Sequence, residues 1–224
     1  TEIRTAFFNV GTALKRARAR FRGKGRFRHL RIRNASNCTL ETGGEVEADD
    51  RIEIESGSTF NLKGKMIAPE VSGDIAITDG GDATVNRVTG NITMGQGKAT
   101  LIVVVGDVEI GDGSELISDD LTGDFTIDNG GEATVERLIG RMIMRRGRAN
   151  VKRIQGAVTV SEGAAFKSEN VEGDVEVDGE TAEITLDNVT GNVNIIKGIN
   201  KPGDSPGITT INGNYTQGAG AQLD

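Results

Sequence analysis

The sequence contains one cysteine, one histidine and no tryptophan among its 224 residues. The single cysteine, Cys38, excludes an internal disulfide and a cysteine-based metal cage. The single histidine, His29, excludes a histidine-pair zinc site and leaves little scope for a Ser–His–Asp triad. Aromatic residues make up only 4% of the chain, so few side chains could stack on a ligand. No apolar run approaches the length of a transmembrane helix.

Proline is also scarce, with three residues, whereas glycine is plentiful, with 32. Eight glycines recur at a nearly constant interval: Gly73, Gly90, Gly106, Gly123, Gly140, Gly156, Gly173 and Gly191. A fixed period of this kind indicates a repeat architecture. Glycine suits corners at which φ is positive or the backbone is crowded, so we expect these register glycines to lie at corners.

Apolar residues keep a constant position relative to the register glycines. The residue two positions before each glycine is aliphatic, and the residues two and four positions after it are apolar. Between them, polar and apolar residues alternate as in β-strands, with clusters such as Asn129–Gly131 between the strands. One such unit cannot bury its apolar side chains alone, but stacked units can. The sequence therefore predicts an all-β, single-stranded parallel β-solenoid, a right-handed β-helix of triangular section with about 17 residues per coil.

The register divides the chain into three predicted segments. Residues 1–27 are a basic, amphipathic cap, residues 28–198 are the solenoid, and residues 199–224 are a Pro/Gly loop and the start of further coils. Five apolar residues of the cap have heptad-like spacing and predict a short helix: Ile3, Phe7, Val10, Leu14 and Ala17. Such a helix would cover the open end of the solenoid; the alternative is an interaction helix for a partner or a membrane surface.

The first 33 residues hold eleven Lys or Arg and one acid, although the whole chain has a net charge of −7. Basic residues with interleaved aromatics can bind nucleic acid or another anionic polymer. No nucleic-acid recognition motif accompanies them, so we expect a solvated or partner-facing basic end without specific nucleic-acid binding. A basic end and an acidic body could also associate head to tail into a filament. The candidate interaction residues are Lys15, Arg16, Arg18, Arg20, Arg22, Lys24, Arg26 and Arg28.

A second basic segment lies inside the repeat. Residues 141–153, here called the arginine rung, carry six Lys or Arg and no acid, and acidic residues precede and follow them by one repeat. Stacking predicts ion pairs between coils, which would fix the register of the strands. The alternative is a site for a sulfated or carboxylated glycan, with Arg145, Arg146 and Arg148 as candidates.

The remaining polar residues predict structure rather than chemistry. Asp or Asn follows most register glycines and should accept backbone N–H groups at the corner. Asp49, Asp50, Glu53 and Glu55 could hold calcium, but they are more typical of a solvated face, and no motif supports calcium or any cofactor. Cys38 is expected in the core. No phosphate-binding loop, metal-ligand spacing or paired carboxylate stands out, so we expect no catalytic, cofactor-binding or metal-binding residues and no enzyme.

The most specific string runs from Pro202-Gly203-Asp204-Ser205-Pro206-Gly207 to Gly213-Asn214-Tyr215-Thr216-Gln217. It resembles segments of bacterial autotransporter passengers and related giant secreted β-helix proteins. That resemblance implies a secreted or cell-surface solenoid, often an adhesin or a structural fibre, in which this segment belongs to the stalk. The basic N-terminal segment does not map onto that family.

The run Val171–Val177 is similar to bactofilins, which are cytoplasmic triangular β-helices that polymerise without nucleotide. Bactofilin cores are shorter and lack the Pro/Gly tail. The sequence thus predicts a structural module of a bacterial surface or secreted fibre or adhesin, acting as a stalk or a self-assembling scaffold. The alternatives are a cytoplasmic, bactofilin-like polymer and an adhesin that binds an anionic glycan.

Overall fold

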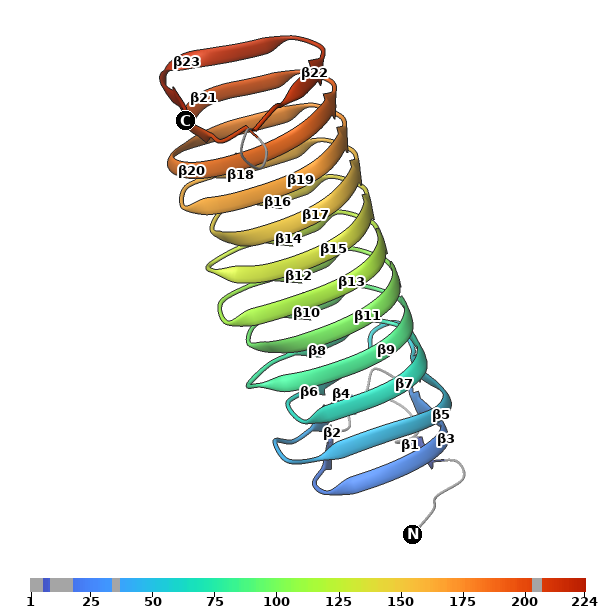
Figure 1. Ribbon diagram of the computed structural model, residues 1–224. Helices are drawn as coiled ribbons and strands as arrows, with labels where there is room; N and C mark the ends of the chain where they lie inside the picture. The colour runs from blue at the N-terminus through green and yellow to red at the C-terminus, as the bar shows by residue number, and fades with distance from the viewer. Residues whose placement is uncertain (1–5, 9–17, 34–36, 203–206) are drawn as a thin grey trace. The chain divides into compact units, whose positions relative to one another are not determined.

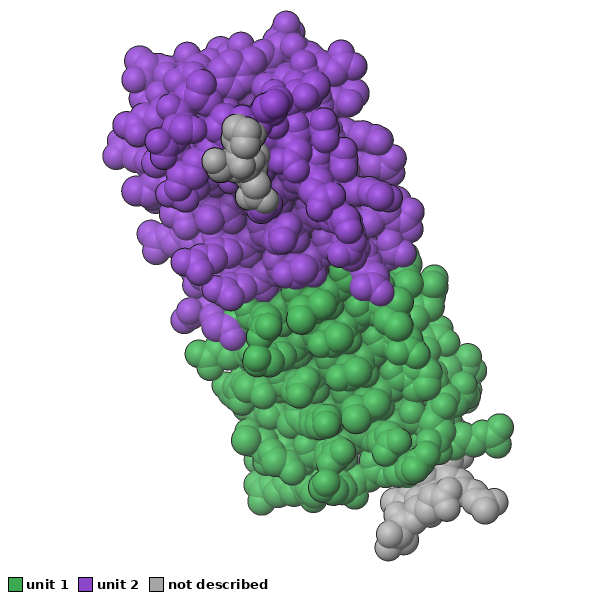
Figure 2. Space-filling model, viewed as in Figure 1, with its two compact units in different colours: residues 1–107, 114–118 green, residues 108–113, 119–224 purple. Residues whose placement is uncertain are grey.

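Residues 6–8, 18–33, 37–202 and 207–224 are those that the computed structural model describes (Figure 1). The chain divides into two compact units, residues 1–107 with 114–118 and residues 108–113 with 119–224 (Figure 2). Each unit is an all-β, single-stranded parallel β-solenoid, which confirms the predicted fold class. The described residues contain no helix, and hence none that is long and apolar enough to span a membrane.

Unit 1 consists of two columns of stacked parallel strands. In the first column the strands are β1 (Ala6–Phe8), β3 (Lys24–Ile32), β5 (Glu45–Ile54), β7 (Lys65–Ser72), β9 (Gly81–Thr89) and β11 (Gly97–Val105). In the second they are β2 (Arg18–Phe21), β4 (Asn37–Leu40), β6 (Thr59–Leu62), β8 (Ile75–Ile77) and β10 (Ile92–Met94). Unit 1 also includes the beginning of β13 (Ser114–Thr122), up to Ser118.

Unit 2 repeats this arrangement with β12 (Val108–Ile110), the rest of β13 and the strands from β14 (Phe125–Ile127) onward. The short strands are β12, β14, β16 (Met142–Met144) and β18 (Val158–Ser161). The long strands are β15 (Gly131–Ile139), β17 (Gly147–Gln155) and β19 (Ala164–Glu172). Both columns continue through β20 (Val175–Thr190) to β21 (Val193–Asn200), β22 (Thr210–Asn212) and β23 (Tyr215–Leu223).

The repeat length agrees with the register of these pairs. Ile75 lies opposite Ile92, and Phe125 lies opposite Met142, in both cases one predicted repeat further along the chain. The first coils are longer, because Lys24 lies opposite Glu45, a wider separation in sequence than that of the later partners. One additional residue lies within the paired strands themselves, where the register of β3 and β5 shifts between Phe27 and His29.

The inward positions predicted from the repeat are all buried. None of the apolar residues at the three fixed positions around the register glycines is more than 3% exposed. Ten apolar residues of the first coils are also buried: Leu30, Ile32, Cys38, Leu40, Val46, Ile52, Ile54, Phe60, Leu62 and Met66. Burial of these ladders from water is the main source of stability for such a fold.

Each long strand bends once while it remains paired. In β15, alternate residues face inward until Glu136 and Arg137, two neighbours that are both exposed, and Leu138 then faces inward again. β9 shows the same pattern at Asn86 and Arg87. A turn of the coil therefore has three inward-facing segments, as the predicted triangular section requires.

The helical cap predicted for the N-terminal segment is wrong for the residues that the structure describes. Ala6–Phe8 and Arg18–Phe21 are strands that pair with β3 and β4. Pairing with an existing strand satisfies the backbone N–H and C=O groups, so position in the fold overrides the helical spacing of the apolar residues. Ile3, Val10, Leu14 and Ala17 lie outside the described residues.

Candidate functional site

Where Asp or Asn follows a register glycine, its side chain forms hydrogen bonds at the corner. In unit 1, the Asn91 N–H donates to Asp74 Oδ1 at 2.8 Å, and the Asp107 N–H donates to Asn91 Oδ1 at 2.9 Å. In unit 2, the Asn192 N–H donates in the same way to Asp174 Oδ1 at 2.8 Å. The prediction that these residues accept backbone N–H groups is confirmed, but the donor belongs to the neighbouring coil. These hydrogen bonds therefore link coils, which spacing within one repeat could not reveal.

A column of side chains in unit 1 alternates in charge from coil to coil. Its members are successive register partners along the first strand column: Lys24, Glu45, Lys65, Asp82, Lys98 and Glu115. Lys24 Nζ lies 2.7 Å from a Glu45 carboxylate oxygen, and Lys98 Nζ lies 2.6 Å from a Glu115 carboxylate oxygen. The hydrogen bond and the charge of Glu45 raise the pKa of Lys24, and Lys24 in turn lowers the pKa of Glu45.

A shorter column of alternating charge lies at the C-terminal ends of the strands of the second column. Its members are Arg20, Glu41, Lys63 and Asp79. Arg20 Nε lies 3.3 Å from Glu41, and Lys63 Nζ lies 2.6 Å from Asp79. The hydrogen bond to Asp79 and its charge raise the pKa of Lys63, and the charge of Glu41 adds to the effect. Lys63 is therefore stabilised in its charged form by two carboxylates.

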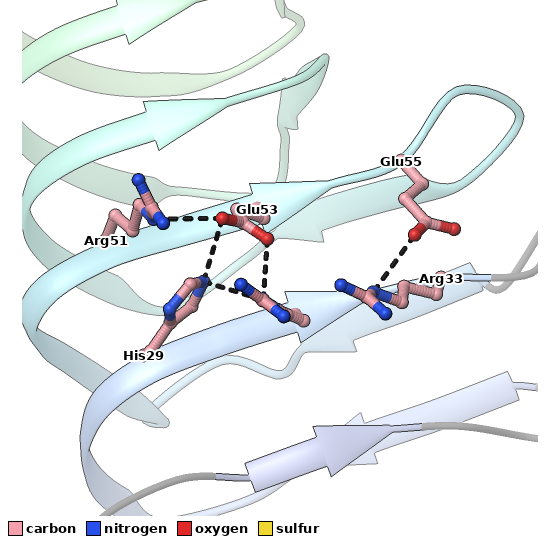
Figure 3. A network of polar contacts seen from close by, with 6 residues as sticks. His29, Arg33, Arg51, Glu53 and Glu55 are labelled. Atoms are coloured by element: carbon pink, nitrogen blue, oxygen red, sulfur yellow. Dashed lines mark hydrogen bonds and ion pairs between the residues drawn. The ribbon is translucent and has the colours of Figure 1, made fainter.

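The outer face of β3 and β5 carries the densest polar network (Figure 3). Glu53 on β5 is within 2.9 Å of Arg51 Nε, 2.6 Å of Arg31 Nε and 3.2 Å of His29 Nε2. At the end of the same strands, Arg33 Nε lies 3.0 Å from Glu55. The basic strand β3, expected to be solvated or partner-facing, lies next to the acidic strand β5 of its own chain.

The candidate interaction residues of the N-terminal segment therefore differ in their surroundings. Arg20, Lys24 and Arg26 are in ion pairs, with Arg26 Nη2 2.7 Å from Asp49. Arg22 and Arg28 are exposed. Lys15 and Arg16 lie outside the described residues, and Arg18 is in β2.

The arginine rung in unit 2 forms ion pairs with the preceding coil, as predicted. The distances are 2.8 Å for Arg141–Asp124, 3.2 Å for Arg145–Asp128, 4.0 Å for Arg148–Glu132 and 3.2 Å for Lys152–Glu136. Hydrogen bonds from the backbone and side chain of Arg141 lower the pKa of Asp124. Within the described part of the chain, Arg146 and Arg153 have no carboxylate partner.

Arg146 lies beside a shallow groove of about 890 Å³ on unit 2. Small residues, among them Gly147 and Ala164, form part of its lining. Its charged lining consists of two cations and three carboxylates: Arg146, Arg148, Asp112, Glu132 and Glu183. An adjoining groove of about 490 Å³ shares Arg146. Arg146, which has no carboxylate partner among the described residues, thus lies in a groove lined by more carboxylates than cations.

The residues considered for calcium or thiol chemistry lie in ion pairs, on the surface or in the core. Of the four calcium candidates, Asp49, Glu53 and Glu55 each lie next to an arginine, and Asp50 is exposed. In the described residues, no three His, Cys, Asp or Glu side chains are grouped so that they could hold a metal ion. Cys38 is 1% exposed, and burial raises the pKa of its thiol to about 12, so the unreactive thiol form is strongly favoured.

No protein-family model, curated protein or solved structure matches this chain. The similarities to autotransporter passengers and to bactofilins therefore remain resemblances of short segments.

Proposed function

We propose that this chain is a structural module, a β-solenoid that acts as a stalk or a self-assembling scaffold in a bacterial surface or secreted fibre. The observation that carries the proposal is that many of its charged side chains form ion pairs between neighbouring coils. Along the columns in both units, cations and carboxylates pair from one coil to the next. A surface whose charges hold neighbouring coils in register favours a mechanical role over catalysis.

The resemblance of the Pro202–Gln217 segment to secreted β-helix proteins supports an extracellular or cell-surface location. The bactofilin-like alternative places the same scaffold in the cytoplasm. Protease treatment of intact producing cells separates these two, because a surface module is degraded and a cytoplasmic one is protected. Protection in intact cells together with loss after permeabilisation would support the alternative.

Self-assembly can be tested on the purified protein by sedimentation velocity over a range of concentrations and by electron microscopy. A self-assembling scaffold grows into filaments as concentration rises, whereas a stalk remains as discrete particles. Release of reducing ends from a panel of polysaccharides, abolished by substitution of one carboxylate, would overturn the structural assignment in favour of an enzyme.

Binding of an anionic glycan is the second candidate, and it is favoured by Arg146 beside the groove, which pairs with no carboxylate of the described residues. Guanidinium groups bind carboxylates and sulfates in bidentate fashion. The three carboxylates of the groove lining oppose such binding, so it would depend strongly on this one arginine.

Retention on an anionic glycan column tests this second candidate. We expect Arg146→Gln to reduce retention and Arg153→Gln, which removes an equal charge from the same rung, to leave it unchanged. Equal losses in the two variants would show general attraction to a cationic surface, and no retention of the wild type would exclude the candidate.

A further inference from the structure

The single histidine of the chain occupies an unusual position between a donor and an acceptor. The Arg31 Nε–H donates to His29 Nε2 at 3.1 Å, and the same Nε2 lies 3.2 Å from Glu53 Oε1. The imidazole is shielded from solvent, with 14% of its side chain exposed. Figure 3 shows His29 on β3 directed toward Glu53 on the neighbouring β5.

One imidazole nitrogen cannot accept from Arg31 and donate to Glu53 at the same time. In the neutral ring, an Nε2 that accepts has no hydrogen, so the proton lies on Nδ1. In the protonated ring, both nitrogens are donors, and Nε2–H faces the Arg31 N–H and loses it as a partner. Glu53 Oε1 is then the acceptor within reach of Nε2.

Arg31 has an alternative partner in the same place. Its Nε carries one hydrogen and lies 2.6 Å from Glu53 Oε2. When His29 no longer accepts, that hydrogen can turn to the carboxylate without a change of strand register. Both groups then donate to one carboxylate, His29 to Oε1 and Arg31 to Oε2.

We propose that His29 is a pH-operated link between the coils of β3 and β5. When the ring is neutral, its hydrogen bond at Nε2 stays within β3, to Arg31. When the ring is protonated, the bond passes to Glu53 on β5, so the histidine joins two coils. Histidine is the side chain that ordinarily changes charge between pH 5 and 8.

Among the described residues, the charged groups around His29 come from three strands. β3 contributes Arg28 and Arg31, and β5 contributes Arg51, the register partner of His29, together with Glu53. β7 contributes Glu70, the register partner of Arg51. The described residues of β1, Ala6–Phe8, are not titratable. Glu53 is thus the one carboxylate within reach of Nε2 in this network.

The position of the imidazole proton tests the proposal on the wild-type protein. With one histidine, the ¹⁵N spectrum of a labelled sample contains a single imidazole. At pH 8 we expect a proton on Nδ1 and none on Nε2; after acidification we expect protons on both nitrogens, with Nε2–H hydrogen-bonded to a carboxylate. A neutral ring with its proton on Nε2 would overturn the proposal, because the link to β5 would then exist at every pH.

A variant shows whether Arg31 positions the proton. Arg31→Gln removes the guanidinium donor, so we expect the neutral ring to move its proton to Nε2 and to bind Glu53 at pH 8. Lys24→Gln removes an equal charge from the same strand and should leave the proton on Nδ1. If Arg31→Gln also left it on Nδ1, Arg31 would have no part in the exchange and the proposal would fail.

Discussion

At the scale of single residues, the register glycines show why the repeat permits so little variation. Gly156 has φ of +147°, a region that L residues rarely adopt. A Cβ there would also collide with the carbonyl oxygen of Gly140 in the preceding coil. The position requires glycine both for its conformation and for the close approach of two backbones.

Substitution of this glycine should therefore be costly. We expect Gly156→Ala to lower the free energy of unfolding by about 3 kcal/mol or more, the upper end of the range for such backbone strain. The matched control is Gly163→Ala, since Gly163 has φ of +69° and no atom nearer than 3.9 Å to the added Cβ. That variant should lose only about 1–2 kcal/mol. Urea denaturation of both measures the difference, and equal losses would contradict the argument.

At Asp124, the contribution of the charge to stability can be measured separately from that of the hydrogen bond. It accepts the Arg141 N–H through Oδ1, a role that Asn91 fills in unit 1. Asp124→Asn should therefore keep the hydrogen bond and lose only the ion pair with Arg141.

The contribution of that ion pair should depend on pH. Because the folded state lowers the pKa of Asp124, its stabilisation is present above the unfolded pKa near 4 and disappears as pH falls through the folded value. We expect Asp124→Asn to cost about 0.5 kcal/mol at pH 7, with the difference from wild type shrinking as the pH falls below about 4. Urea denaturation across this range measures it, and a difference that grew on acidification would refute the interpretation.

At the scale of elements, the arginine rung shows how charge can specify register. Lys152 on β17 lies 3.2 Å from Glu136 on β15, and its other neighbour in the stack is Glu169 on β19. If the coil that carries Lys152 were left out of the stack, Glu136 and Glu169 would lie opposite one another, and like charges in that position are destabilising. The charged columns thus complement the apolar ladders, which would tolerate such an omission.

Reversal of this charge should be worse than its removal. We expect Lys152→Gln to cost up to about 1 kcal/mol and Lys152→Glu about 1 kcal/mol more, since carboxylates of both neighbouring coils would then face a third carboxylate. Thermal denaturation at low salt measures both variants. Added salt should reduce the difference by screening; equal effects of the two substitutions would show that the rung does not fix register.

The elements also mark the limits of inference from the sequence. The inward positions from Val71 onward follow from a constant spacing of apolar residues, and every one of them is buried. The predicted N-terminal helix failed because heptad-like spacing reports local periodicity, whereas Ala6–Phe8 pair with the distant β3. The pairing of the basic β3 with the acidic β5 was missed, since the longer first coils separate partners by more than the regular period. A search for opposite charges at that wider interval could have found it.

At the scale of the whole molecule, the question is how far its charge governs association. The chain has 26 basic and 33 acidic residues, and many of the described ones are paired within the chain. Cations that already form ion pairs within their own chain attract the carboxylates of a second molecule less strongly. This weakens the expectation that the basic end of one molecule binds the acidic body of another.

Assembly should accordingly resist salt. We expect the sedimentation profile of the purified protein to be unchanged between about 0.05 and 0.5 M NaCl, although screening of exposed charges increases strongly over that range. As a control, Arg22→Gln and Arg28→Gln together remove two exposed cations of the N-terminal segment and should leave the profile unchanged. Dissociation of assemblies by salt, or by these substitutions, would instead support head-to-tail association of the basic end with the acidic body.

The sequence alone determined that the chain coils, where each coil turns and which side chains face inward, because burial and backbone conformation depend on residue type at a fixed period. Only the tertiary structure decided which polar groups meet. Lys24 pairs with Glu45, Arg146 pairs with no carboxylate among the described residues, and His29 lies between Arg31 and Glu53. Those contacts depend on the length of every coil and on the irregular register at Phe27–His29, and a shift of one residue would turn each of these side chains to the opposite face of the sheet.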